Sequence, residues 1–225
     1  MELKRKAEAL LRSEDFENQL GSLHQLPARR IINALLPLLC SPDELVKWRA
    51  VTALGVVVAR LADADAEAAR AIMRRLMWSL NDESGAIGWG APEAMGEIMA
   101  MHEGMAKEFS EILVSYLSEG GTSGGTSLEN PLLVRGVLWG LGRLGQVQPR
   151  LLADAVPDVA PWLASADPTL RGLALWVLTL VDTRPGVPPQ VEALLLDESE
   201  LPLYLDRTLT VRRVCDLAAK WTRRT

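Results

Sequence analysis

Hydrophobic residues along most of this chain recur at intervals of three and four, the spacing that places them on one face of an α-helix. The clearest runs are Val51, Leu54, Val57, Val58 and Leu61 in one segment and Phe109, Ile112, Leu113, Tyr116 and Leu117 in another. Strand-like alternation of polar and apolar residues is absent by the same test. The pattern therefore predicts an all-α protein.

The helical segments group into five pairs. We expect the first helices of the pairs at residues 28–40, 66–80, 106–117, 151–164 and 189–196. We expect the second helices at residues 46–61, 89–101, 133–144, 170–181 and 206–223. Short segments rich in Asp, Asn, Ser and Pro separate several of these helices, and such residues suit a helix start because they cap its first N–H groups or tolerate its first turn.

The second helices share a sequence pattern with a period of about 40 residues. Its anchor positions are Ala53, Ala94, Gly140, Val177 and Ala218, which are 41, 46, 37 and 41 residues apart. Self-similarity at this period predicts a solenoid of stacked helix pairs. We expect one domain over residues 1–225, with repeats over 28–223 and a capping helix within 1–27, because a terminal repeat must cover its apolar face.

One connector interrupts the third unit. Residues 119–130 begin with a Gly-, Ser- and Thr-rich run that is typical of a flexible loop. The sequence leaves open whether this loop is a lid or a tolerated insertion.

The repeat units resemble HEAT repeats, in particular the short phycobilisome-lyase-like type. Val134-Arg135 followed by Gly140-Leu141-Gly142-Arg143-Leu144-Gly145 carries the resemblance most closely. The resemblance implies a right-handed α-solenoid. It also implies a ladder of Arg and Asp residues between repeats, at Arg49, Arg135, Arg171 and Arg212, with Asp43 and Asp167 as partners. Such repeats serve scaffolds, lyases, chaperones and DNA-repair enzymes, so they do not define a function.

Composition narrows the range of partners. The formal net charge is −5 and the lysines and arginines are dispersed, whereas nucleic-acid binders and membrane-surface proteins usually present a basic face. Cys40 and Cys215 lie in different repeats and in apolar patterns, which favours buried, reduced thiols. With no secretory signal or membrane-spanning segment in the sequence, we expect a cytoplasmic protein.

The inner face of the solenoid carries the candidate binding site. Trp89, Glu93 and Glu97 form one stripe along a predicted helix, and Arg135, Trp139 and Arg143 form another, because residues four apart share a helix face. Trp48 and Trp176 extend this groove on the first and fourth units. Tryptophan is enriched where proteins bind partners. In the competing structural interpretation, the tryptophans fill space between repeats and the two glutamates pair with Arg135 and Arg143.

The repeat pattern breaks at Gly88-Trp89-Gly90-Ala91-Pro92-Glu93, where the ladder arginine is missing. Departures from a local rule concentrate at functional sites, so we place the functional centre here. Pro92 fits the first turn of a helix and so fixes where that helix begins. Glu93 then offers a fixed negative charge for a cationic group of a partner.

No motif for a catalytic nucleophile, metal or cofactor accompanies these residues. His102-Glu103 resembles one His-Glu pair of HEAT-like deoxyhypusine hydroxylases, but a single pair cannot build their di-iron centre, and His102 fits a solvated or capping residue. We therefore predict a non-enzymatic scaffold or adaptor that holds a protein or peptide segment on its concave face. The alternative is a lyase or carrier for a hydrophobic cofactor such as a tetrapyrrole. A DNA-repair role is disfavoured by the net charge.

Overall fold

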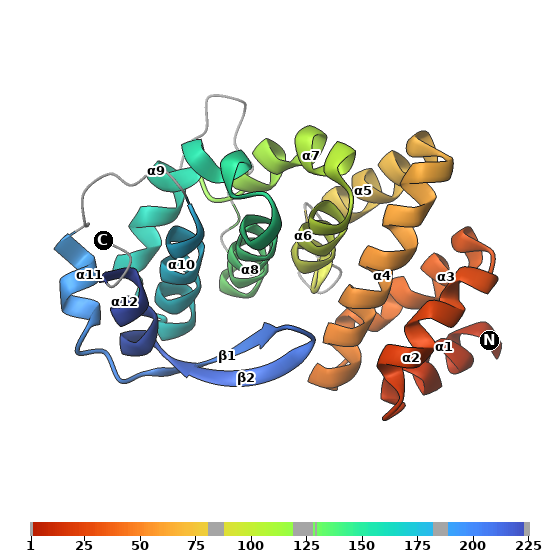
Figure 1. Cartoon of the computed structure of the whole chain (residues 1–225), viewed down its shortest axis with the longest axis horizontal. Helices are drawn as coiled ribbons and strands as arrows, with labels where there is room; N and C mark the ends of the chain where they lie inside the picture. The colour runs from red at the N-terminus through yellow and green to blue at the C-terminus, as the bar shows by residue number, and fades with distance from the viewer. Residues whose placement is uncertain (1, 81–87, 119–127, 129, 182–188, 223–225) are drawn as a thin grey trace.

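A computed structural model describes residues 2–80, 88–118, 128, 130–181 and 189–222. Within these residues the chain forms a right-handed α-solenoid of helix pairs, as the sequence predicts. Figure 1 shows the pairs following one another across the molecule, from α1 at one end to α12 at the other. The glycine-rich loop of the third unit lies largely outside the described residues.

The second helix of each pair contributes to an inner layer. These helices are α4 (Glu44–Ala64), α6 (Ala91–Met101), α8 (Pro131–Val147), α10 (Pro168–Leu180) and α12 (Val214–Thr222). The first members form an outer layer of α3 (Ala28–Leu35) with η2 (Leu36–Cys40), α5 (Ala66–Leu80), α7 (Glu103–Ser115), then η3 (Pro149–Ala155), α9 (Val156–Val159) and η4 (Ala160–Ala164), and finally α11 (Pro189–Leu194). The N-terminal end is covered by α1 (Glu2–Arg12), α2 (Phe16–Leu20) and η1 (Gly21–Gln25).

Polar side chains begin the inner helices where the sequence indicates. The carboxylate of Asp43 accepts the backbone N–H groups of Leu45 and Val46 at the start of α4. Asn130 and Asp167 cap α8 and α10 in the same way. His102 is the N-terminal cap of α7, which confirms its predicted capping role. These bonds satisfy N–H groups that have no partner inside the helix, and so they fix where each inner helix starts.

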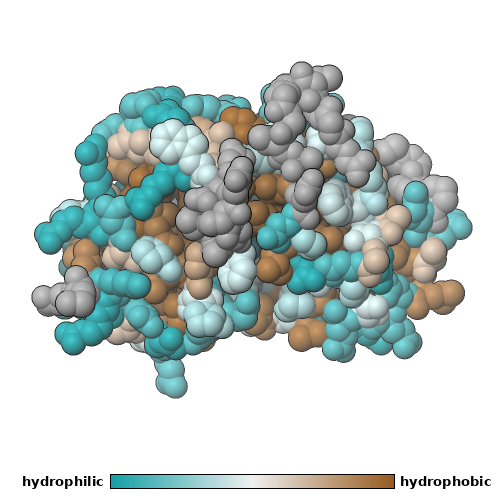
Figure 2. All heavy atoms as spheres, turned by 180° about the vertical axis from the view of Figure 1, so that it is seen from behind, coloured by the Kyte–Doolittle hydropathy of each residue, from teal (hydrophilic) through white to brown (hydrophobic). Residues whose placement is uncertain are grey.

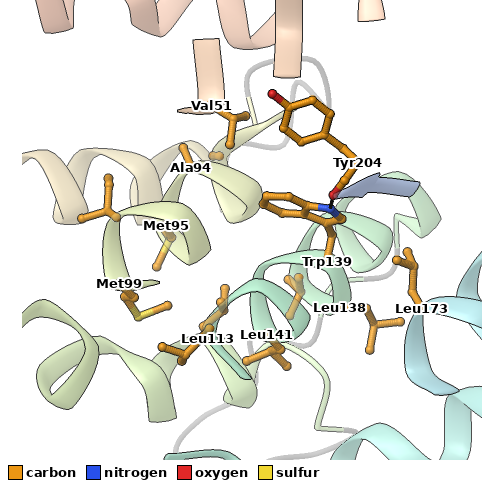
Figure 3. Packing of buried hydrophobic residues seen from close by; sticks show 14 of the residues in the cluster. Val51, Ala94, Met95, Met99, Leu113, Leu138, Trp139, Leu141, Leu173 and Tyr204 are labelled. Atoms are coloured by element: carbon orange, nitrogen blue, oxygen red, sulfur yellow. Dashed lines mark hydrogen bonds between the residues drawn. The ribbon is translucent and has the colours of Figure 1, made fainter. Parts of the chain in front are cut away.

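The core is one contiguous cluster of buried apolar side chains between the two layers, running from Ala7 to Trp221. Figure 3 shows part of it, with Met95 and Met99 from α6, Leu113 from α7, and Leu138 and Leu141 from α8. The two helices approach closely at Gly96 and Gly140, because a Cβ atom on Gly96 would lie 2.2 Å from the Cα atom of Gly140. Glycine at this crossing lets the centre of the solenoid pack backbone against backbone.

A β-hairpin replaces part of the fifth pair, so the prediction of a helix over 206–223 is wrong before Val214, although the fold is helical as predicted. Strand β1 (Glu200–Leu205) pairs antiparallel with β2 (Thr208–Arg213), and α12 begins only at Val214. The turn consists of Asp206 and Arg207, both with positive φ, at 49° and 61°. Two such residues match the twist of a tight hairpin. The expected ladder residue Arg212 therefore lies in a strand.

The hairpin crosses the inner layer. In Figure 1 it extends from beside α12, below α10, α8 and α6, to a tip near α4. Leu201, Leu203 and Tyr204 of β1 are buried, whereas β2 leaves Leu209 and Val211 exposed. Figure 2 shows the molecule from the opposite side, where hydrophobic residues are visible between hydrophilic ones.

Candidate binding pocket on the inner face

The tip of the hairpin is held by an aromatic cluster on the inner layer. The ring of Tyr204 stacks on Trp48 at 5.0 Å and 11°, and Trp48 lies 4.7 Å from Trp139. The indole N–H of Trp139 donates to the backbone carbonyl of Tyr204 at 2.9 Å, and the Tyr204 hydroxyl lies 3.2 Å from that of Thr52. Figure 3 shows the indole nitrogen of Trp139 directed at the backbone of Tyr204. These contacts separate the inner face into two pockets.

One of them, here called the tryptophan pocket, has a volume of about 460 Å³. It is bounded by the N-terminal halves of the inner helices and by the hairpin. Its lining is Leu39, Ser41, Pro42, Glu44, Lys47, Trp48, Trp89, Gly90, Glu93, Leu132, Arg135, Trp139, Thr169, Leu173, Pro202 and Leu209. Five of the eight residues that the sequence analysis placed in a binding groove therefore meet here: Trp48, Trp89, Glu93, Arg135 and Trp139.

Glu93 supplies a buried charge in the wall of the tryptophan pocket. Its Oε1 lies 3.2 Å from the ammonium nitrogen of Lys47. Its Oε2 is buried and has no hydrogen-bond partner among the described residues. This oxygen sits against Gly136, where a Cβ atom would lie 2.5 Å away. An open groove would have left Glu93 accessible, whereas its exposure is only 5%.

Lys47 completes this charged wall. Burial alone would lower the pKa of Lys47, but the charges of Glu93 and Glu44 outweigh burial and raise its pKa above the ordinary value. The ammonium group also lies 4.9 Å from the centre of the Trp48 ring. Lys47 was not among the residues expected in the groove. It lies four residues before Val51 and so on the same helix face as the apolar stripe, but this position does not indicate which acidic residue it pairs with.

The broken repeat pattern has a structural cause. Gly90 has φ of 75°, a conformation that favours glycine. A Cβ atom there would also lie 2.8 Å from the carbonyl oxygen of Leu39. Helix α6 begins directly afterwards, with Pro92 in its first turn as predicted. Trp89, directly before this tight turn, is 42% exposed and lines the tryptophan pocket.

Glu97 belongs to the other pocket, here called the polar pocket, which has a volume of about 440 Å³. Its carboxylate accepts a hydrogen bond from Arg143 at 2.7 Å. Both residues line this pocket with Arg207 at the hairpin tip. Glu93 and Glu97 thus lie on opposite sides of the aromatic cluster and have separate partners.

The remaining expected residues have structural contacts. Arg135 forms its ion pair with Asp167 at 2.5 Å, and Arg171 forms one with Asp197 at 2.6 Å, so the implied ladder exists at these two positions. The competing structural interpretation pairs Glu93 with Arg135 and Glu97 with Arg143. The second pair is present, whereas Glu93 pairs with Lys47 instead. Arg49 instead donates to the backbone carbonyls of Leu11 and Ser13.

Two further expectations are corrected. Trp176 is 6% exposed and packs where a side chain on Gly142 would stand, so it fills space between α8 and α10 and lines neither pocket. Asp43, expected as a ladder partner of an inner-helix arginine, pairs with Arg12 of the capping helix.

The two cysteines form no disulfide, and Cys40 is exposed where a buried thiol was expected. Its thiol lies 3.6 Å from the Trp89 carbonyl. Within the described parts of the chain, no three His, Cys, Asp or Glu side chains gather in a way that could hold a metal ion. No helix there combines the length and apolar character that crossing a bilayer requires.

Comparison with known proteins supplies no established function. No known family pattern matches the chain. The sequence is 32% identical over 124 residues to an uncharacterized protein of Archaeoglobus fulgidus, a match that covers 55% of this chain and 57% of that protein. The chain thus matches little more than half the length of this relative.

Solved structures share the fold. An engineered protein matches with a TM-score of 0.54 and 19% identity over 99% of this chain and 96% of its own. A second engineered protein gives a TM-score of 0.51 and 18% identity over 96% of this chain and 56% of its own. A HEAT-like repeat protein of Thermococcus onnurineus is also a neighbour, with a TM-score of 0.41 and 16% identity over 98% of this chain and 79% of its own.

Proposed function

We propose that this protein is a non-enzymatic interaction scaffold that holds a peptide segment of a partner protein in the tryptophan pocket. The observation that carries the proposal is the preformed pocket itself, in which three tryptophans and several aliphatic side chains meet a few polar groups. Binding sites typically combine such apolar walls with a small number of placed polar groups, in volumes of about 300–1,000 Å³. Neither nucleic acid nor a membrane is part of the proposal.

Trp89 is the anchor that a partner would contact first. Trp89 is 42% exposed, whereas Trp48 and Trp139 of the same pocket are buried. Large aromatic side chains with few rotatable bonds lose little entropy on binding, which is why they dominate the energetics of many interfaces. The exposed edge of β2 at Leu209 lines the same pocket, so a bound segment would contact both the helices and the hairpin.

A selection from a random heptapeptide library on the immobilised protein tests the proposal. The selected peptides should bind with a Kd that rises at least about tenfold in Trp89→Ala, because the pocket loses its exposed aromatic wall. Trp78→Ala is the matched control, since Trp78 is 73% exposed on α5 and does not line the pocket. A library that yields no binder, or binders equally weakened by both substitutions, would reject the proposal.

The rival function is a carrier or lyase for a hydrophobic cofactor such as a tetrapyrrole, as the resemblance to phycobilisome-lyase-like repeats implies. The apolar, aromatic lining of the tryptophan pocket is the observation that favours it. Bilin added to the protein would then quench tryptophan fluorescence at stoichiometric concentration, and Trp89→Ala would reduce that quenching. The peptide proposal predicts neither result.

A further inference from the structure

We propose, on the basis of the function proposed above, that the segment bound in the tryptophan pocket inserts a lysine side chain whose ammonium group binds the unpartnered oxygen of Glu93. Three features of the pocket indicate the chemical class of the ligand. They are its charge balance, the incomplete hydrogen bonding of Glu93 and the aromatic walls.

The charged groups around the pocket leave an excess of one negative charge. Two carboxylates, Glu44 and Glu93, and two cations, Lys47 and Arg135, line the pocket. Arg135 is already balanced by Asp167, which lies outside the lining, so Lys47 alone faces the two lining carboxylates. Complementary charge is what orients and selects a partner at an interface. An occupant with a single positive charge would balance the pocket.

Glu93 has one oxygen available for that charge. Lys47 occupies Oε1, whereas Oε2 is buried without any hydrogen bond from the described residues. A buried polar atom without a partner is costly, and a ligand that supplies the missing donor recovers that cost. In the unbound protein Oε2 lies against Gly136. The terminal carboxylate torsion of glutamate is broad, so a ligand ammonium would bind this oxygen after the carboxylate rotates toward the pocket.

The arrangement favours lysine over arginine. An arginine side chain binds a carboxylate best through two parallel N–H···O bonds, which need both oxygens. Since Lys47 already holds Oε1, Glu93 offers a single contact, which suits the compact charge of an ammonium group. The aliphatic stem of a lysine would pack on the apolar walls while its charged end reaches Glu93.

The tryptophan rings add a second attraction. An ammonium group over the face of an indole is stabilised by the ring electrons. Trp48 already has the ammonium of Lys47 at 4.9 Å from its ring centre. Trp89 lines the same pocket and is 42% exposed, with no such contact among the described residues, so its face is available to a second cation.

The test uses peptides obtained from the library selection. We expect a lysine at one fixed position of the selected sequences. Replacement of that lysine by norleucine, which keeps the aliphatic stem and removes the charge, should raise the Kd for the wild-type protein at least about tenfold, as for loss of a hydrogen bond to a charged group. Arginine at the position should bind more weakly than lysine. Isothermal titration calorimetry measures the Kd of the lysine, norleucine and arginine peptides.

Glu93→Gln should abolish the preference for lysine over norleucine, and the matched variant Glu97→Gln should keep it, since Glu97 lies in the polar pocket. Equal binding of lysine and norleucine peptides to the wild-type protein would overturn the inference while the scaffold function stands. That comparison needs no variant to fold. A preference for lysine that persists in folded Glu93→Gln would overturn the role of Glu93. A library without binders would instead reject the scaffold function.

Discussion

Two glutamates one helical turn apart on α6 have different roles in the structure. Glu97 has its charge balanced by Arg143 at 2.7 Å, whereas Glu93 shares one oxygen with Lys47 and leaves the other unpartnered. Their spacing in the sequence predicts only that they share a helix face. The difference arises because the hairpin tip and the aromatic cluster stand between them, and these come from residues far along the chain.

Removal of the Glu97 carboxylate should destabilise the protein. Glu97→Gln leaves Arg143 partly buried without its charged partner, and we expect a loss of about 1–3 kcal/mol in the free energy of unfolding. Urea unfolding measures this loss of free energy in Glu97→Gln, in Arg143→Gln and in the double variant. The two losses should be less than additive, since either substitution breaks the same pair. Strict additivity would show that the pair does not act as a bridge.

Asp167 should make stability fall in acid. Burial alone would raise the pKa of Asp167, but hydrogen bonds from Arg135 and from the N–H of Thr169 outweigh it and lower this pKa. Because the folded pKa lies below the unfolded value of about 3.9, the stabilisation is complete above about pH 5 and is lost as the pH falls through the lowered pKa.

Urea midpoints measured between pH 7 and pH 3 check this expectation. The wild-type protein should lose more stability on acidification than Asp167→Asn, which has no carboxyl group to protonate at this position. Identical pH profiles for the two proteins would contradict the assignment.

The sequence identifies most pocket residues but not their contacts. Trp48, Trp89 and Trp139 follow from helix periodicity and repeat stacking, which place equivalent positions side by side. Trp176 satisfies the same criteria, yet it packs against Gly142 because a glycine opposite it leaves room for the ring. Lys47 could not be predicted, since its role depends on Glu93, 46 positions later in the sequence.

At the scale of helices, the contact between α6 and α8 depends on the absence of side chains. Gly96→Ala would place a Cβ atom 2.2 Å from the Cα atom of Gly140, so the two backbones would have to separate. We expect a loss of about 1–3 kcal/mol, the usual cost of overpacking. Gly21→Ala is the control, because nothing lies within 4 Å of its Cβ position. Thermal melts that rank the two variants equally would contradict this packing account.

The helix pairs could be predicted from the sequence and the hairpin could not. Leu201, Leu203 and Leu205 stand at alternate positions, but Pro202 and Tyr204 between them do not make a polar–apolar alternation, and six residues also allow a helical turn. Because four helix pairs precede this segment, the repeat pattern favours another pair of helices here. Tertiary contacts decide that this segment is a strand and not a helix. Leu201 and Leu203 are fully buried by the inner layer, and Tyr204 stacks on Trp48. A residue pattern this short cannot indicate such distant partners.

At the scale of the molecule, we propose that residues 1–225 form a single domain. A solenoid normally has contacts only between neighbouring repeats, so its stability is a sum of local terms. Here the hairpin links the last pair to the first pair, through Tyr204 with Trp48, and to the N-terminal cap, through the ion pair of Arg207 with Glu17. These long-range contacts should make the array unfold as one unit.

Calorimetry should therefore show one unfolding transition whose van't Hoff and calorimetric enthalpies agree. Tyr204→Ala removes the stacked ring and its hydrogen bond to Thr52, so we expect a lower Tm and a broader transition. Tyr116→Ala is a buried control of the same residue type, outside the hairpin. It should lower the Tm without broadening the transition. Unfolding transitions of equal width in the wild-type protein, Tyr204→Ala and Tyr116→Ala would show that the hairpin does not couple the two ends of the solenoid.

The same hairpin gives the protein a fixed length. Repeat arrays commonly gain or lose units, since each new pair needs only two matching faces. In this chain an added pair would increase the distance from α10 to α4 by about 8–10 Å, the usual spacing of packed helices. At about 3.3 Å per residue, each strand would then need about three more residues to reach Trp48 and Glu17. The length of the hairpin thus matches the number of helix pairs. Homologues with another number of pairs should carry a hairpin of altered length or none.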